Sequence, residues 1–105
     1  MMAWVYLLIA GLFEIGWPLG FKLAQTTGSF FHWICFSVVA MTLSGIFLYL
    51  AQREIPIGKA YAVWTAIGAA GTYAIGVLMF QDAVSIAAMT GLIFIISGVV
   101  LLKTA

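Results

Sequence analysis

A chain of 105 residues that is 66% hydrophobic and only 7% charged is not a water-soluble domain, because such domains carry about a quarter charged residues. The mean hydropathy of 1.23 indicates an integral membrane protein, and the net charge of +1 gives no reason to expect a nucleic-acid partner. The single cysteine, Cys35, lies in an apolar run, so we expect neither a disulfide nor a metal site, and we expect no cofactor.

Four apolar segments follow one another along the chain, and each is long enough to cross a bilayer core of ~30 Å as a helix. Short polar turns separate them, which predicts that consecutive helices are antiparallel neighbours. We therefore predict an all-α membrane protein in which residues 1–105 form a single four-helix transmembrane domain. The predicted helices cover residues 3–24, 31–51, 58–80 and 85–102.

One carboxylate, Glu14, interrupts the first apolar segment near its midpoint. A charge at the bilayer midplane costs on the order of 3 kcal/mol, and acids in such positions are usually functional. Gly11 and Trp17 share its helical face, so Gly11 is expected to leave space beside the carboxylate and Trp17 to offer a flat π surface. Pro18 has no N–H for the Glu14 carbonyl, which predicts a kink there. These neighbours favour a site for protons and cations over a protonated glutamate that merely bonds a neighbouring helix.

The second and third segments supply polar and aromatic groups for the same site. Ser44 is expected to hydrogen-bond either the carboxylate or the backbone of its own helix. Tyr61 and Trp64 share one face of the third segment, and Trp64 lies about 9 Å into the membrane by helical rise. Buried Trp and Tyr side chains need hydrogen-bond partners, and we predict that Glu14 serves both. An aromatic cavity with a carboxylate selects organic cations, and competition between cation and proton for that carboxylate is antiport.

The fourth segment carries Gly91 and Gly98, seven residues apart on one stripe. Small residues at this spacing let helices approach closely, which favours a dimer interface here over packing within one subunit. We find no internal repeat, although transporters that alternate access usually contain two inverted repeats. A dimer of oppositely inserted subunits would supply the missing symmetry.

The distribution of basic residues bears on orientation. Three of them lie on the N-terminal side of the predicted bundle and one on the other side: Arg53, Lys59 and Lys103 against Lys22. This mild bias favours an N-terminus inside the cell and leaves open a heterodimer with a paralogous subunit of opposite bias.

Several motifs together resemble the small multidrug resistance family over essentially the whole chain. They are Glu14 in the first segment, Pro56-Ile57-Gly58-Lys59-Ala60-Tyr61-Ala62-Val63-Trp64-Thr65 at the start of the third, and Gly91 with Gly98 in the fourth. Trp17, three residues after the glutamate, is similar to the guanidinium-exporter subtype of that family. The resemblance implies an antiparallel homodimer, or a heterodimer with a paralogue, spanning the bacterial cytoplasmic (inner) membrane several times. It also implies exchange of protons for guanidinium or small substituted guanidinyl cations.

By the same resemblance, Glu14 binds both the proton and the organic cation. The residues that position the carboxylate and line the site are Gly11, Trp17, Ser44, Tyr61 and Trp64. Two residues, Pro18 and Ala66, depart from the family pattern, and both could alter the range of substrates. Ala66 replaces a glycine at a bend in the third helix.

Two other functions compete with guanidinium export. A quaternary-ammonium multidrug/proton antiporter uses the same scaffold, but the bulk of Trp17 suits small planar cations better. A non-transporting subunit of a heterodimeric pair is a second alternative, yet such a subunit gains nothing from Glu14 at the midplane. An enzyme is least expected, because the sequence has no nucleophile–base pair, metal cluster or phosphate loop.

Overall fold

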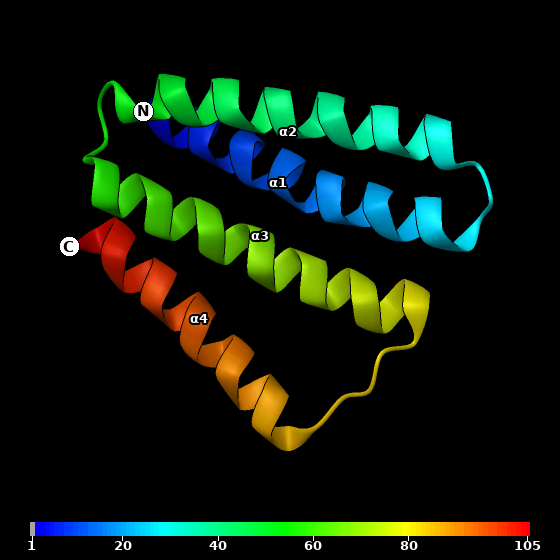
Figure 1. Cartoon of the computed structure of the whole chain (residues 1–105). Helices are drawn as coiled ribbons and strands as arrows, with labels where there is room; N and C mark the ends of the chain where they lie inside the picture. Colours follow the sequence, from blue (N-terminus) through cyan, green and yellow to red (C-terminus); the bar gives the residue numbers. More distant parts are fainter. Residues whose placement is uncertain (1) are drawn as a thin grey trace.

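The computed structural model describes residues 2–105, which form four α-helices joined by short turns (Figure 1). All four helices are long and apolar enough to cross a membrane, so the prediction of an all-α protein with four spans is confirmed. The helix ends differ from the predicted ranges by at most two residues. The helices are α1 (Met2–Thr26), α2 (Phe30–Gln52), α3 (Ile57–Phe80) and α4 (Ile86–Thr104).

Helix α1 is the centre of the arrangement, because it packs against both α2 and α3. Its contact with α2 is the more extensive, and Pro18 lies within the helix without ending it. Helix α4 packs against α3, lies close to it where α4 ends, and diverges from it where α4 begins (Figure 1). None of the α4 residues is buried. Three helices therefore form the packed unit, and α4 extends from it.

The buried core lies at the end of the bundle where α1 and α3 begin and α2 ends. Small side chains there let the helices approach closely, since apolar lipid provides little force to drive helices together. Larger apolar side chains cover the outside of the helices, as expected for surfaces that face lipid. The buried cluster consists of Ala3, Leu7, Ala51, Ile55, Ala60 and Val63.

Two serines of α2 fix how this helix lies on α1. Ser37 and Ser44 are both 0% exposed, and each hydroxyl donates to a backbone carbonyl of α1. The distances are 2.9 Å from Ser37 Oγ to the Trp17 oxygen and 2.8 Å from Ser44 Oγ to the Ala10 oxygen. Because each bond satisfies a buried hydroxyl, sliding α2 along α1 would leave both serines unpaired. This pairing bonds Ser44 to a carbonyl one turn of α1 before Glu14, which brings the hydroxyl beside the glutamate side chain.

Candidate functional site

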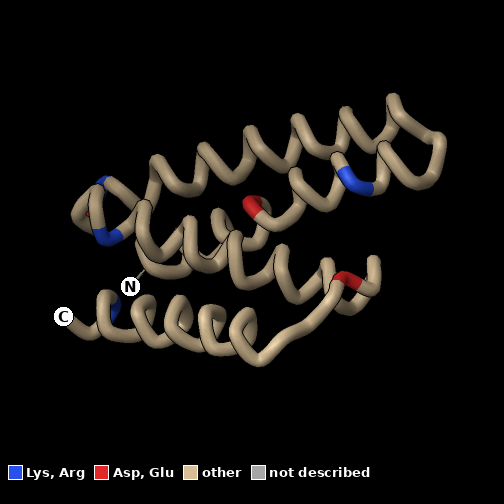
Figure 2. Tube along the Cα trace, turned by 60° about the horizontal axis from the view of Figure 1, so that its bottom comes forward, with Lys and Arg blue, Asp and Glu red and all other residues tan. Residues whose placement is uncertain are grey.

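Glu14 is a half-buried carboxylate in the middle of α1. Figure 2 shows one acidic position midway along the bundle, whereas the other charged positions lie near its ends. The indole Nε1 of Trp17 donates to Glu14 Oε1 at 2.8 Å, a bond between residues three apart on one helix. A donor at this distance holds the carboxylate in one orientation, and bonds to a charged acceptor are the stronger kind.

Ser44 connects the three packed helices at this site. Its oxygen accepts from Trp64 Nε1 at 2.8 Å, and it lies 2.8 Å from the Ala10 oxygen and 3.4 Å from Glu14 Oε1. A hydroxyl has one proton, so it donates to only one of these acceptors at a time. The shorter distance favours the Ala10 carbonyl. The hydroxyl therefore bonds the backbone of α1, a partner that we did not predict. It also lies near the carboxylate, which was one of the two predicted partners.

The position of Ser44 changes the predicted role of Trp64. We predicted that Glu14 accepts the Trp64 N–H directly, and the structure shows this prediction to be wrong. The Ser44 oxygen accepts that N–H instead, because α2 brings the hydroxyl between α1 and α3. Trp64 therefore reaches the carboxylate through Ser44.

Glycines let α1 and α3 come close together around the carboxylate. A Cβ at Gly68 would lie 2.6 Å from Glu14 Cγ, so the glutamate side chain occupies the space that a larger residue would fill. Gly71 receives Ile15 in the same way, one turn further along α3. A Cβ at Gly11 would lie 2.6 Å from Cγ2 of Ile67, so Gly11 makes room for α3. We had expected Gly11 to make room for the carboxylate.

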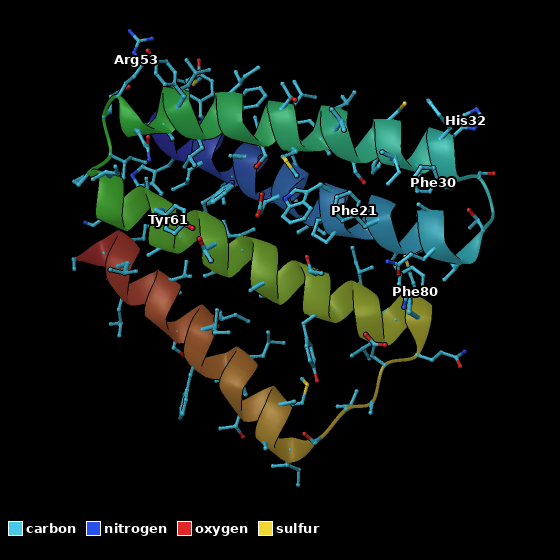
Figure 3. The ribbon with its side chains drawn as sticks, in the orientation of Figure 1. Phe21, Phe30, His32, Arg53, Tyr61 and Phe80 are labelled. Atoms are coloured by element: carbon cyan, nitrogen blue, oxygen red, sulfur yellow. The ribbon has the colours of Figure 1, made fainter. Side chains whose placement is uncertain are left out.

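Tyr61 lies at the outer edge of the aromatic groups. Its ring centroid is 5.3 Å from that of Trp64, and the side chain is 55% exposed (Figure 3). Among the described residues, no hydrogen bond joins its hydroxyl to Glu14. The structure therefore brings Trp17, Ser44 and Trp64 into one network with the carboxylate and leaves Tyr61 facing outward.

Trp17 Nε1 donates to Oε1 of Glu14, and the Ser44 hydroxyl reaches the same oxygen when its proton turns away from the Ala10 carbonyl. Oε2 takes part in neither, so a cation with two N–H donors has an oxygen to bind. Within residues 2–105 no three His, Cys, Asp or Glu side chains gather as metal ligands would. The arrangement suits a nitrogen cation held by a carboxylate beside indole rings.

Gly91 and Gly98 lie outside this network, on α4. A Cβ added at either glycine would meet no atom within 4 Å, so both face open space in a single chain. This is the surface that we predicted as a dimer interface.

Comparison with known proteins gives a consistent answer over nearly the whole chain. The family model described as Small Multidrug Resistance protein matches residues 2–95. A relative from Yersinia pseudotuberculosis named "Guanidinium exporter" is 39% identical over 104 residues, which is 99% of each chain. Relatives of the same name from Citrobacter freundii and Salmonella typhimurium are 39% identical over 102 residues, covering 97% of this chain and 96% of theirs.

Proposed function

The chain belongs to the small multidrug resistance family, and we propose that it exports guanidinium or small substituted guanidinyl cations in exchange for protons. The observation that carries this proposal is the geometry of Glu14, a carboxylate halfway through the bundle with Oε1 held by Trp17 and Oε2 left for another donor. The relatives are named as exporters, which supports a transporter over an enzyme.

Guanidinium matches the groups around this carboxylate. It is planar and presents two parallel N–H donors to a carboxylate, and its face stacks on an indole ring. In the proposal Trp17 orients Glu14, and Ser44 with Trp64 holds the carboxylate from the α2 and α3 sides. Tyr61 lines the entrance of the site.

Coupling follows from competition for one group. A proton and a guanidinium ion both bind the Glu14 carboxylate, so each displaces the other, and a site that is open to one side of the membrane at a time exchanges them. Lower pH should therefore weaken guanidinium binding. A quaternary ammonium ion has no N–H to donate to Oε2, which gives the multidrug alternative a weaker match to this site.

We further propose that the transporting unit is an antiparallel dimer joined through α4. The open stripe of Gly91 and Gly98 supports this, because close helix contacts in membranes use small residues. A homodimer is the simplest form, and a heterodimer with a paralogous subunit is the alternative. The chain is a multi-pass membrane protein, and its bacterial relatives support the cytoplasmic (inner) membrane as its location.

The test is the current evoked by guanidinium, guanylurea and tetrapropylammonium in proteoliposomes that contain the purified protein. We expect current with the two guanidinyl cations, none in Glu14→Gln, and normal current in Glu54→Gln. Glu54 is a matched control because it is an exposed carboxylate in the turn between α2 and α3. An equal current with tetrapropylammonium would favour the multidrug alternative. Silence that ends when a paralogue is co-reconstituted would favour the heterodimer, and silence in both conditions would refute transport.

A further inference from the structure

A cleft with one basic and one acidic residue in its lining lies between α1 and α3, at the opposite end of the bundle from the buried core. It encloses about 190 Å³, and one wall comes from Pro18 and Lys22 of α1. The other wall comes from Thr72 and Phe80 of α3, with Asp82 just beyond the helix. Figure 3 shows Phe80 at this end of α3, beside the last turns of α1. The cleft is separate from the carboxylate site, because Glu14 is not among the residues that line it.

The end of α3 holds Asp82 in this cleft. Gln81 adopts the left-handed conformation with φ 56°, and the backbone N–H groups of Gln81 and Asp82 both donate to the Gly76 carbonyl, the latter at 3.0 Å, which ends the helix. The Asp82 carboxylate then folds back onto the last turn, because Gly76 has no Cβ where Asp82 Oδ2 lies. The Asp82 carboxylate thus adds its charge to the negative end of the helix dipole.

Lys22 shows that a cation fits this environment. Its Nζ lies 5.9 Å from the centre of the Phe80 ring, within the range of a cation–π contact. In the part of the chain that the structure describes, Lys22 and Asp82 do not approach within the 4.0 Å of an ion pair, so the carboxylate is left for another partner. An aromatic face, a carboxylate and a helix C-terminus are together the groups that bind an organic cation.

We propose that this cleft is a second cation site, which takes guanidinium or another small planar organic cation on its way to or from Glu14. The proposal rests on the proposed function. We call the site the vestibule and define it by Lys22, Thr72, Phe80 and Asp82. The flat cation stacks on Phe80 and donates N–H groups to Asp82, while the Lys22 ammonium moves out to the headgroups.

The vestibule lies next to the carboxylate site along α1 and α3. Its inner wall includes Ile15, the residue after Glu14, and Thr72 lies one turn of α3 beyond Gly68, which contacts the glutamate side chain. Because Lys22 competes for the vestibule, an entering cation binds there only weakly and passes on. In an antiparallel dimer the two vestibules would lie at opposite membrane surfaces, one for entry and one for exit.

Cation binding in the vestibule can be measured at Asp82, because it is the only aspartate in the chain. Labelling aspartate with ¹³C at Cγ gives one carboxyl resonance, which can be followed in the full-length protein in nanodiscs. The Glu14→Gln background removes the central site, so a response there comes from the vestibule. The titrants are guanidinium chloride, NaCl at equal ionic strength, and urea, which has nearly the same shape without the charge.

We expect a saturable shift of the Asp82 resonance with guanidinium and none with urea. NaCl should give at most a small unsaturated drift from screening. Lys22→Met should lower the half-saturating concentration several-fold because it removes the competing ammonium, and Phe80→Leu should raise it several-fold. Equal responses to guanidinium and NaCl, or no change in Lys22→Met, would overturn the proposal.

Transport by the otherwise unaltered chain separates this inference from the proposed function. Asp82→Asn should raise the KM for guanidinium current several-fold and leave the maximal current within about twofold, whereas Glu14→Gln abolishes current. Guanidinium current with an unresponsive Asp82 resonance would refute the vestibule and leave export standing. A saturable Asp82 response in a protein that passes no guanidinium current would refute export and the transit role together.

Discussion

Replacing Gly68 with alanine tests the close contact between α3 and the Glu14 side chain. A Cβ at this buried position would lie 2.6 Å from Glu14 Cγ and 3.4 Å from Glu14 Cβ, and the first distance is shorter than real Cβ contacts allow. Retreat of helix α3 is costly because it would give up the close packing of Gly71 against Ile15 of α1. The glutamate side chain must therefore move.

The size of the effect follows from the bonds that position the carboxylate. Glu14 Oε1 accepts from Trp17 at 2.8 Å, and a hydrogen bond to a charged group contributes about 1.5–3 kcal/mol. A guanidinium N–H bond to the same carboxylate belongs to this class. Misaligning one such bond should weaken guanidinium binding by about 10- to 100-fold, since each 1.4 kcal/mol is a factor of ten.

The assay is the guanidinium concentration that gives half-maximal current, measured in proteoliposomes. Gly58→Ala is the matched control, because it makes the same change in the same helix where a Cβ would meet no atom within 4 Å. We expect Gly58→Ala to behave like the unaltered chain and Gly68→Ala to need far more guanidinium. If Gly68→Ala gives an unchanged half-maximal concentration, the carboxylate is not held against α3 and our account of the site is wrong.

Two further predictions concern the helix contacts. Ser44→Ala removes the acceptor of the Trp64 N–H, and an unpaired buried donor costs about 1–3 kcal/mol. Thermal unfolding in detergent should therefore occur at a lower temperature than in the exposed control Thr42→Val. Equal unfolding temperatures of the two variants would contradict the hydrogen bond. Gly98→Leu fills the open stripe of α4 and should shift the protein from dimer to monomer in crosslinking experiments. The control Gly45→Leu lies on an open face of α2 and should leave the dimer intact. An unchanged dimer in Gly98→Leu would place the interface elsewhere.

The four spans could be predicted from the sequence because each depends only on a local property. An apolar run of sufficient length must form its backbone hydrogen bonds internally in lipid, and a helix does so without reference to the rest of the chain. The contact between Trp17 and Glu14 was accessible for the same reason, since residues three apart share a helical face.

Contacts between helices required the three-dimensional structure. Ser44 was recognised as a polar residue in an apolar helix, but its bond to Ala10 depends on how α2 is placed along α1. A one-residue change in that placement would turn the hydroxyl away from both Ala10 and Glu14. Ser37 had no assigned partner for the same reason, and the structure pairs it with Trp17.

The glycines of α3 show how one residue type can have several meanings in a sequence. In the sequence alone, Gly68, Gly71 and Gly76 are typical of a helix that bends easily. In the structure each glycine instead receives a side chain, from Glu14, Ile15 and Asp82 respectively. Two of these side chains belong to α1, so the glycines set the distance between α1 and α3.

The position of helix α4 follows from the same physics, because α4 packs against α3 but buries none of its own residues. In lipid, helices associate through close packing and hydrogen bonds, because apolar surface alone gains nothing by leaving the lipid tails. Helix α2 meets these needs with two serines bonded to α1, whereas α4 has no buried residue and turns Gly91 and Gly98 to open space. Close packing at those glycines would need a surface outside the chain, which is why we propose a second subunit as the partner of α4.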